Sequence, residues 1–219
     1  RPYTCDANVV TLLWTFYGSV DNLRKSRYTI SSLTNPTNIA NALTSMKNEK
    51  VNSTLVSNYV QHIIDSFLIS MAKRYDVKEK TYFKYPNKYY YTDIGLRNAR
   101  LNYRQYDPGH IMENIIYNEL LSRGYSVDVG VVTDRTGGAN TQKEIDFVVN
   151  DADKKIYIQS AFQMDADKKE SSELASLILT KDFFKKIIVR MDIPHNFYDD
   201  NGIFHCNLID LLLGRIELF

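Results

Sequence analysis

The sequence is poor in cysteine and contains no long hydrophobic run. Its two cysteines, Cys5 and Cys206, lie far apart and form no CxxC spacing. Two thiols could form one disulfide, but reduced cysteines fit an intracellular protein better. No apolar run approaches the length of a membrane span, and no signal-like segment opens the chain. We therefore expect a cytoplasmic protein that does not cross a membrane.

The sequence also lacks an excess of charge of either sign. The 27 Lys and Arg residues against 26 Asp and Glu residues give a formal net charge of +1. Nucleic-acid binding driven by overall charge is excluded, so any such binding depends on a local patch. The four histidines show no metal-ligand spacing. The first residue is Arg1 rather than Met, from which we expect a piece of a longer polypeptide.

The first half of the chain predicts three helices followed by a β-hairpin. Residues 6–20 show helical spacing of apolar residues, Asn35-Pro36 begins a second helix that ends near Met46, and Asn52 or Ser53 caps a third. Two strands over 69–77 and 82–92 follow. This order is the outline of a winged helix, in which the third helix commonly enters a DNA major groove.

Polar and basic residues of this half are candidates for contacting nucleic acid. They are Ser57, Asn58 and Gln61 on the third helix and Lys73, Arg74, Lys78, Lys80 and Lys84 on the hairpin. Polar side chains read base edges, and lysines near phosphates release counterions. The alternative is that these are solvated faces of a packing module, which the shortage of Arg and Lys on the helix favours.

The second half predicts a mixed sheet flanked by helices, so the fold class is α/β (α+β). Helix 110–123 precedes strands at 125–132, 144–149 and 155–162, and a helix over 166–179 precedes a strand at 185–191. A short strand at 203–204 and a helix over 208–213 end the chain. Pro108-Gly109 marks a break. We predict a winged-helix-like domain over 1–97 and an α/β domain over 98–219.

One acid stands in the middle of an apolar strand. Asp146 lies between Ile145 and Phe147, and the next strand carries Gln159 at the matching position. A buried carboxylate needs a metal, a basic partner or hydrogen-bond donors, because burying it alone is costly. In the non-catalytic interpretation Asp146 accepts hydrogen bonds from helix or loop amides, and Glu113 is exposed or paired with Lys143.

This arrangement resembles the core of the PD-(D/E)XK nucleases, which place an acid on one strand and Glu-x-Lys on the next. Here the second half of the motif reads Gln159-Ser160-Ala161. The resemblance makes Glu113, Glu144, Asp146 and Gln159 the candidate catalytic residues, with Glu113 and Asp146 as metal ligands. Alanine at 161 cannot supply the cation that orients water and stabilises the pentavalent charge. We predict a site without turnover. The alternative is a divergent metal-dependent nuclease using Glu113, Glu144 and Asp146.

A wider resemblance rests on an ordered set of short runs. They are KRYD at 73–76, KYY at 88–90, DIGLRN at 93–98, GHIMEN at 109–114, ELLSRGY at 119–125, EIDF at 144–147 and IYIQ at 156–159. Together they resemble the C-terminal half of bacterial and archaeal AAA-type ATP-binding proteins, which carries a nuclease-like domain of unknown function. The resemblance implies a preceding P-loop ATPase module that would bind ATP and Mg²⁺. The chain itself has no G-x-x-x-x-G-K-[ST], so we expect no cofactor in it.

Three functions follow from these patterns. The leading hypothesis is a non-catalytic module that binds DNA or a protein partner and signals this binding to the ATPase module. Phosphate contacts and catalysis use different residues, so a nuclease scaffold can still bind nucleic acid after its catalytic residues are lost. A divergent nuclease and a homo-oligomerisation module of the ATPase are the alternatives.

Overall fold

The computed structural model describes residues 33–100, 103, 107–135, 140–164 and 174–219. The predicted helix over 6–20 and Cys5 lie outside these residues. The chain divides into two compact units. The first comprises the described residues up to Met71 together with Tyr85–Tyr106, and the second comprises Ala72–Lys84 and Asp107–Phe219.

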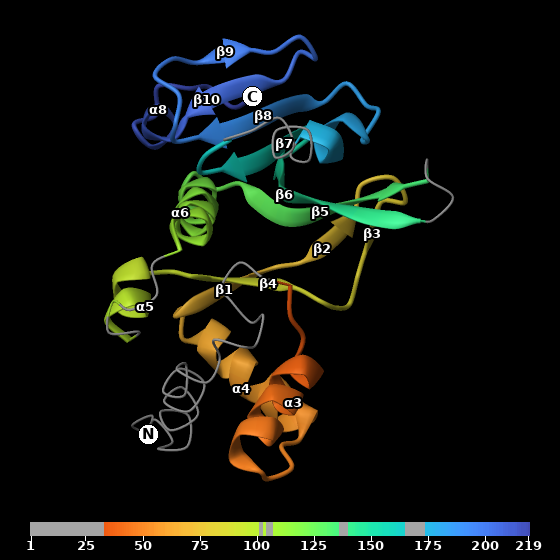
Figure 1. Ribbon diagram of the computed structural model, residues 1–219, viewed down its shortest axis with the longest axis vertical. Helices are drawn as coiled ribbons and strands as arrows, with labels where there is room; N and C mark the ends of the chain where they lie inside the picture. Colours follow the sequence, from red (N-terminus) through yellow and green to blue (C-terminus); the bar gives the residue numbers. More distant parts are fainter. Residues whose placement is uncertain (1–32, 101–102, 104–106, 136–139, 165–173) are drawn as a thin grey trace. The chain divides into compact units, whose positions relative to one another are not determined.

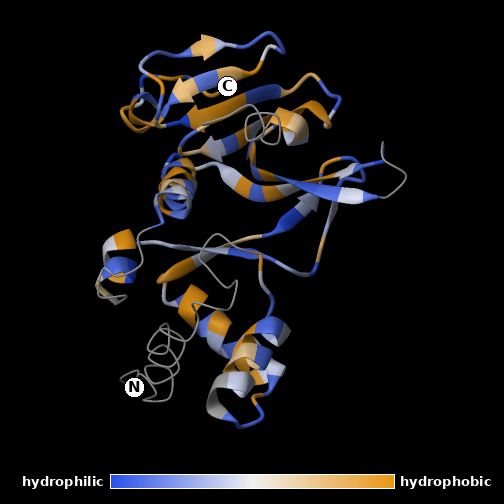
Figure 2. Ribbon diagram, in the orientation of Figure 1, coloured by the Kyte–Doolittle hydropathy of each residue, from blue (hydrophilic) through white to orange (hydrophobic). Residues whose placement is uncertain are grey.

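Two capped helices form the core of the first unit. Helix α3 (Pro36–Lys47) begins where the sequence predicts, since Asn35 Oδ1 accepts a hydrogen bond from the Asn38 N–H at 2.7 Å. Asn52 caps α4 (Ser53–Asp65) in the same way. Figure 2 shows hydrophobic and hydrophilic residues side by side on both helices, as expected for helices that bury one face. The buried side chains are Ile39, Ala40, Leu43, Val56 and Val60.

The predicted hairpin divides between the two units. Strand β1 (Ile69–Ala72) pairs with β4 (Lys88–Tyr91) in a two-stranded sheet, and α5 (Ile94–Arg100) follows β4 in the chain. Strands β2 (Arg74–Asp76) and β3 (Thr81–Tyr82) instead join the sheet of the second unit, because β2 pairs in parallel with β5. The units therefore differ from the predicted division at 97/98, and the basic hairpin residues belong to the second unit.

The second unit is built on an eight-stranded mixed sheet in the order β3-β2-β5-β6-β7-β8-β10-β9 (Figure 1). Its remaining strands are β5 (Ser126–Asp134), β6 (Thr141–Asp151), β7 (Lys154–Ala161), β8 (Lys185–Arg190), β9 (Phe197–Tyr198) and β10 (Phe204–Asn207). Strands β5, β6 and β7 are antiparallel neighbours, whereas β7, β8 and β10 run parallel. The predicted class, a mixed sheet flanked by helices, is confirmed at this level.

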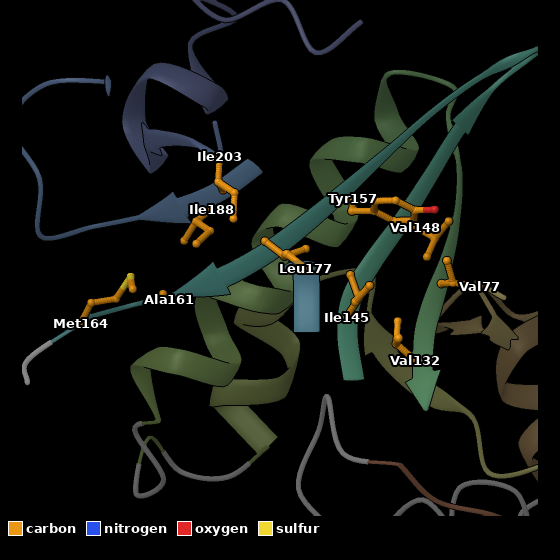
Figure 3. Packing of buried hydrophobic residues seen from close by; sticks show 10 residues of the cluster. All are labelled: Val77, Val132, Ile145, Val148, Tyr157, Ala161, Met164, Leu177, Ile188 and Ile203. Carbon is orange, nitrogen blue, oxygen red and sulfur yellow. The ribbon is translucent and has the colours of Figure 1, made fainter. Parts of the chain in front are cut away.

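Helical segments cover the two faces of this sheet. On one face α6 (Pro108–Ser122) packs against β5, β6 and β7, and the rings of Tyr117 and Phe147 are 6.3 Å apart. The helical turn over 174–178 places Leu177 in the cluster on the other face, where Val148 lies beside Tyr157 (Figure 3). Helix α8 (Leu208–Leu212) packs on β8 and β10. In the described part of the chain, no helix combines the length and apolar character needed to cross a membrane.

A β-bulge interrupts the pairing of β5 with β6. Asp128 pairs with Val148 and Gly130 pairs with Ile145, so two steps along β5 match three steps along β6. The extra residue lies in the stretch that contains Asp146. A bulge of this kind turns a side chain away from the regular alternation of a strand. The local geometry of Asp146 therefore differs from that of an ordinary inward-facing strand residue.

Candidate functional site

Strands β6 and β7 separate at Asp146. Their regular pairing ends at Phe147 and Ile158, while β6 continues beside β5 and β7 continues beside β8. Two hydrogen bonds involving side chains bridge the opening. The Asp146 N–H donates to Gln159 Oε1 at 3.2 Å, and the Ser160 N–H donates to Asp146 Oδ2 at 2.9 Å. Side-chain oxygens thus accept from backbone groups that would otherwise lose their partners where the strands part.

Both side chains at this opening are buried, with 7% exposure each. A buried backbone N–H without an acceptor costs free energy, so each oxygen has a structural role. Asp146 and Gln159, which the sequence predicts to lie on neighbouring strands, meet at this opening. The Ser160 N–H lies on strand β7, whereas the non-catalytic interpretation expects donors from a helix or a loop.

Position 161, where a PD-(D/E)XK nuclease would carry lysine, holds a buried alanine. Ala161 is 4% exposed and belongs to the apolar cluster of Figure 3. Its partner on β8 is Arg190, whose guanidinium donates two 2.8 Å hydrogen bonds to Asp192. These bonds from Arg190 lower the pKa of Asp192 to about 2. The Arg190 guanidinium, beside Ala161, is therefore paired with Asp192, which lies just beyond the end of β8.

The other candidate acids lie in different surroundings. Glu113 on α6 is buried, which rules out the expected exposed state, and its Oε2 lies 3.9 Å from His110 Nδ1. Glu144 is half-buried. Burial lowers the pKa of Arg74, and the negative charge of Glu144 acts in the opposite direction. Among the described residues, no group of three His, Cys, Asp or Glu side chains is placed to hold a metal ion. The predicted metal ligands Glu113 and Asp146 are therefore not part of a three-residue metal site within the described residues.

The candidate nucleic-acid residues fall into separate units. Ser57, Asn58 and Gln61 lie on α4 in the first unit, where Ser57 is half-buried and the other two are exposed. Gln61 donates to Asp65 Oδ1 at 2.8 Å. The five basic candidates lie in the second unit. The candidate residues of the third helix and those of the hairpin therefore belong to different compact units.

Arg74 corrects the sequence interpretation. It is 9% exposed, donates to Gln142 Oε1 at 3.0 Å and lies with its guanidinium 4.9 Å from the centre of the Phe83 ring. Burial lowers its pKa. A side chain enclosed in this way fixes β2 against the sheet and does not reach a phosphate. Among the other basic candidates, Lys78 donates to the Thr133 carbonyl, and Lys73, Lys80 and Lys84 are exposed.

A further polar cluster, which the sequence does not predict, joins β3 to β5 across β2. Asp128 on β5 is buried and accepts a hydrogen bond from the Tyr82 hydroxyl at 2.8 Å. Burial raises the pKa of Asp128, although the bond from Tyr82 and the charges of Lys73 and Lys155 act in the opposite direction. Burial and the Asp128 bond raise the pKa of Tyr82 to about 12. The cluster exists because β2 pairs with β5, which local sequence does not reveal.

The chain is similar to two proteins of known sequence. One is an uncharacterized protein of Haemophilus influenzae, 37% identical over 160 residues that make up 73% of this chain and 37% of the relative. The other is an uncharacterized protein of Methanocaldococcus jannaschii, 28% identical over 132 residues, or 60% of this chain and 28% of the relative. The chain therefore spans about a third of the length of these relatives. No family model matches the chain, and no solved structure matches it significantly.

Proposed function

We propose that this chain is a non-catalytic binding module of an AAA-type ATPase, built on a degenerate nuclease-like scaffold. The observation that carries the proposal is the pair of hydrogen bonds between Asp146, Gln159 and Ser160. One oxygen of the carboxylate that a nuclease would use for Mg²⁺ accepts from a backbone amide. The side-chain oxygen of Gln159 accepts from the Asp146 N–H, as a backbone carbonyl would in a regular strand pair.

The chemistry of the surrounding positions supports this proposal. Mg²⁺ prefers several hard oxygen ligands in near-octahedral geometry. Gln159 supplies a neutral amide where the nuclease motif has an anion, and Ala161 supplies no charge. A phosphoryl-transfer site needs a cation near the developing charge, and the guanidinium across from Ala161 is bound to Asp192.

Membership of a larger protein is the second part of the proposal. The matched relatives are much longer than the matched region, as expected if the region is one part of a multidomain protein. The resemblance of the ordered runs to AAA-type ATP-binding proteins supplies the nature of the remainder. In this proposal the N-terminal ATPase module binds ATP and Mg²⁺, the protein is cytoplasmic, and its subunits can assemble into homo-oligomers.

A cleavage assay tests the non-catalytic part. The 219-residue chain is incubated with supercoiled plasmid and with single-stranded DNA in Mg²⁺ and in Mn²⁺. We expect no cleavage above that of a matched Asp146→Ala preparation. Cleavage that is lost on substitution of Glu113, Glu144 or Asp146 would overturn the proposal and establish the divergent nuclease instead.

A further inference from the structure

Aromatic rings and lysines gather on the sheet face that carries the apolar cluster of Figure 3. Tyr75 on β2 pairs with Tyr82 on β3 and with Gly130 on β5, and the two tyrosine rings are 5.2 Å apart. Gly130 pairs with Ile145 of the cluster. Since paired residues of neighbouring strands share a face, the two tyrosines lie on the cluster side.

A lysine joins these tyrosines to a phenylalanine from the segment before β8. The Lys155 ammonium is 4.9 Å from the centre of the Tyr75 ring and 5.6 Å from that of Phe184. Phe184 meets Tyr157 edge to face, with 6.0 Å between ring centres. We call Tyr75, Tyr82, Lys155, Phe184 and the nearby Lys73 the aromatic–lysine surface.

The two outer rings of this surface are exposed although they are held in place. Tyr82 is 59% exposed and Phe184 is 44% exposed. The Tyr82 hydroxyl is fixed by Asp128 at 2.8 Å, and the Phe184 ring packs edge to face on Tyr157. A ring that is ordered but open to solvent loses little conformational entropy when a ligand stacks on it.

The carboxylates beside the surface are engaged by other protein groups. Asp128 accepts from Tyr82. Asp182 accepts from the Tyr157 hydroxyl at 2.7 Å and from Lys186 Nζ at 3.3 Å. The ammonium groups of Lys73 and Lys155 are close enough to Asp128 to act on its charge, yet neither is among its hydrogen-bond donors in the described contacts. The surface therefore presents positive charge together with two exposed aromatic rings, Tyr82 and Phe184.

We propose that the aromatic–lysine surface binds single-stranded nucleic acid, with bases stacked on Tyr82 and Phe184 and phosphates beside Lys73 and Lys155. The inference rests on the proposed function, because it supplies the ligand of the binding module. Aromatic faces accept any unpaired base, and lysines beside them follow the backbone. Bases in a duplex are stacked on each other and do not offer a face to these rings, which favours the single strand.

Fluorescence anisotropy with the 219-residue chain tests the proposal. The probes are labelled oligo(dT) and oligo(rU) of about 20 nucleotides and a DNA duplex of equal length. We expect both single strands to bind more tightly than the duplex. We also expect affinity to fall as salt rises from roughly 50 to 200 mM, because lysine–phosphate contacts release counterions.

Single substitutions locate the binding on this surface. Tyr82→Ala and Phe184→Ala should each weaken binding about tenfold, the size expected for loss of one base–ring stack. Tyr82→Phe keeps the ring and should retain most of the affinity. Lys155→Gln should lower the salt dependence of binding. Matched controls are Tyr198→Ala, an exposed ring on the edge strand β9, and Lys154→Gln, an exposed neighbour of Lys155.

Thermal unfolding of every variant separates loss of binding from loss of fold. The proposal is overturned if the wild-type chain binds none of the probes at low salt, if the duplex binds as tightly as the single strands, or if the controls lose as much affinity as Tyr82→Ala and Phe184→Ala. Binding of an acidic peptide with no binding of the oligonucleotides would also overturn it. None of these results concerns cleavage, so the non-catalytic proposal is judged separately.

Discussion

Gly130 is the residue that allows the β6 bulge to form. A Cβ atom at this position would lie 2.8 Å from Val148 Cγ2 and 2.9 Å from Ile145 Cβ. Both neighbours are fully buried on β6. The close approach of β5 to the bulged strand, and not an unusual backbone angle, is what requires glycine here.

We therefore expect Gly130→Ala to lower the free energy of unfolding by about 1–3 kcal/mol, since the buried neighbours must shift. The measurement is equilibrium urea denaturation. Gly109→Ala on α6 is the matched control, because its Cβ would meet only Asp107 Oδ1 at 3.5 Å. That variant should be neutral or slightly more stable. Equal stability of the wild type and Gly130→Ala would contradict the packing argument.

Asp192 provides a pH-dependent contribution to stability. Bonds from Arg190 lower its pKa to about 2. A carboxylate whose pKa is lower in the folded state stabilises the fold above its unfolded value near 4 and loses that contribution as pH falls through 2. The residue is exposed, so water screens the pair. Asp192→Asn should cost on the order of 0.5–1 kcal/mol at neutral pH.

Urea denaturation between pH 7 and pH 2 measures this effect. The difference between Asp192→Asn and the wild type should shrink as pH approaches 2. Asp200→Asn, at an exposed turn position, is the matched control for removal of a surface carboxylate. A difference that stays constant with pH would show that the Arg190 pair is not its source.

At the scale of elements, the separation of β6 from β7 is held by side chains. Asp146→Ala removes the acceptor of the Ser160 N–H and should destabilise the chain by about 1–3 kcal/mol. Asp146→Asn keeps an oxygen at the same place and should lose less. Hydrogen exchange at the Ser160 amide should accelerate in the alanine variant more than in the asparagine variant. Unchanged exchange in both would mean that this bond does not hold the opening together.

Elements defined by local signals were predictable from the sequence. Asn35-Pro36 begins α3 as expected, and the apolar runs of β6, β7 and β8 are strands within a few residues of the predicted bounds. Pro108-Gly109 predicts a break, but helix α6 begins at Pro108 because Asp107 accepts from the His110 N–H. An aspartate directly before proline is a local signal for a helix start.

Elements defined by distant partners were not predictable. Strand β2 lies beside β5, more than fifty positions later, at Arg74 and Val129. Hydropathy reports that a strand has a buried face but not which strand it joins. The burial of Arg74 follows from that pairing. The candidate site departs from this division, since Asp146 and Gln159 on two different strands were predicted to be neighbours, whereas the local i,i+3 approach of Glu113 to His110 on α6 was not.

At the scale of the whole molecule, each unit has a core of its own. Val56 is 1% exposed in the core of the first unit. Val56→Ala should cost roughly 1.5–2 kcal/mol of local stability. Hydrogen exchange should accelerate in α3 and α4 and change little in β6, β7 and β8, because separate cores open independently. Equal acceleration in both units would show that they unfold as one.

Because the chain passes between the two units, the choice of fragment boundaries affects the sheet of the second unit. Residues Ala72–Lys84 leave one core, add two strands to the other, and return. A fragment that starts at residue 98 would lack β2 and β3, and the nine-residue strand β5 would then be the border of its sheet. An uncovered border of that length offers unpaired backbone groups to other molecules and promotes aggregation. A fragment meant to contain the complete second unit must therefore include residues Ala72–Lys84 as well as Asp107–Phe219.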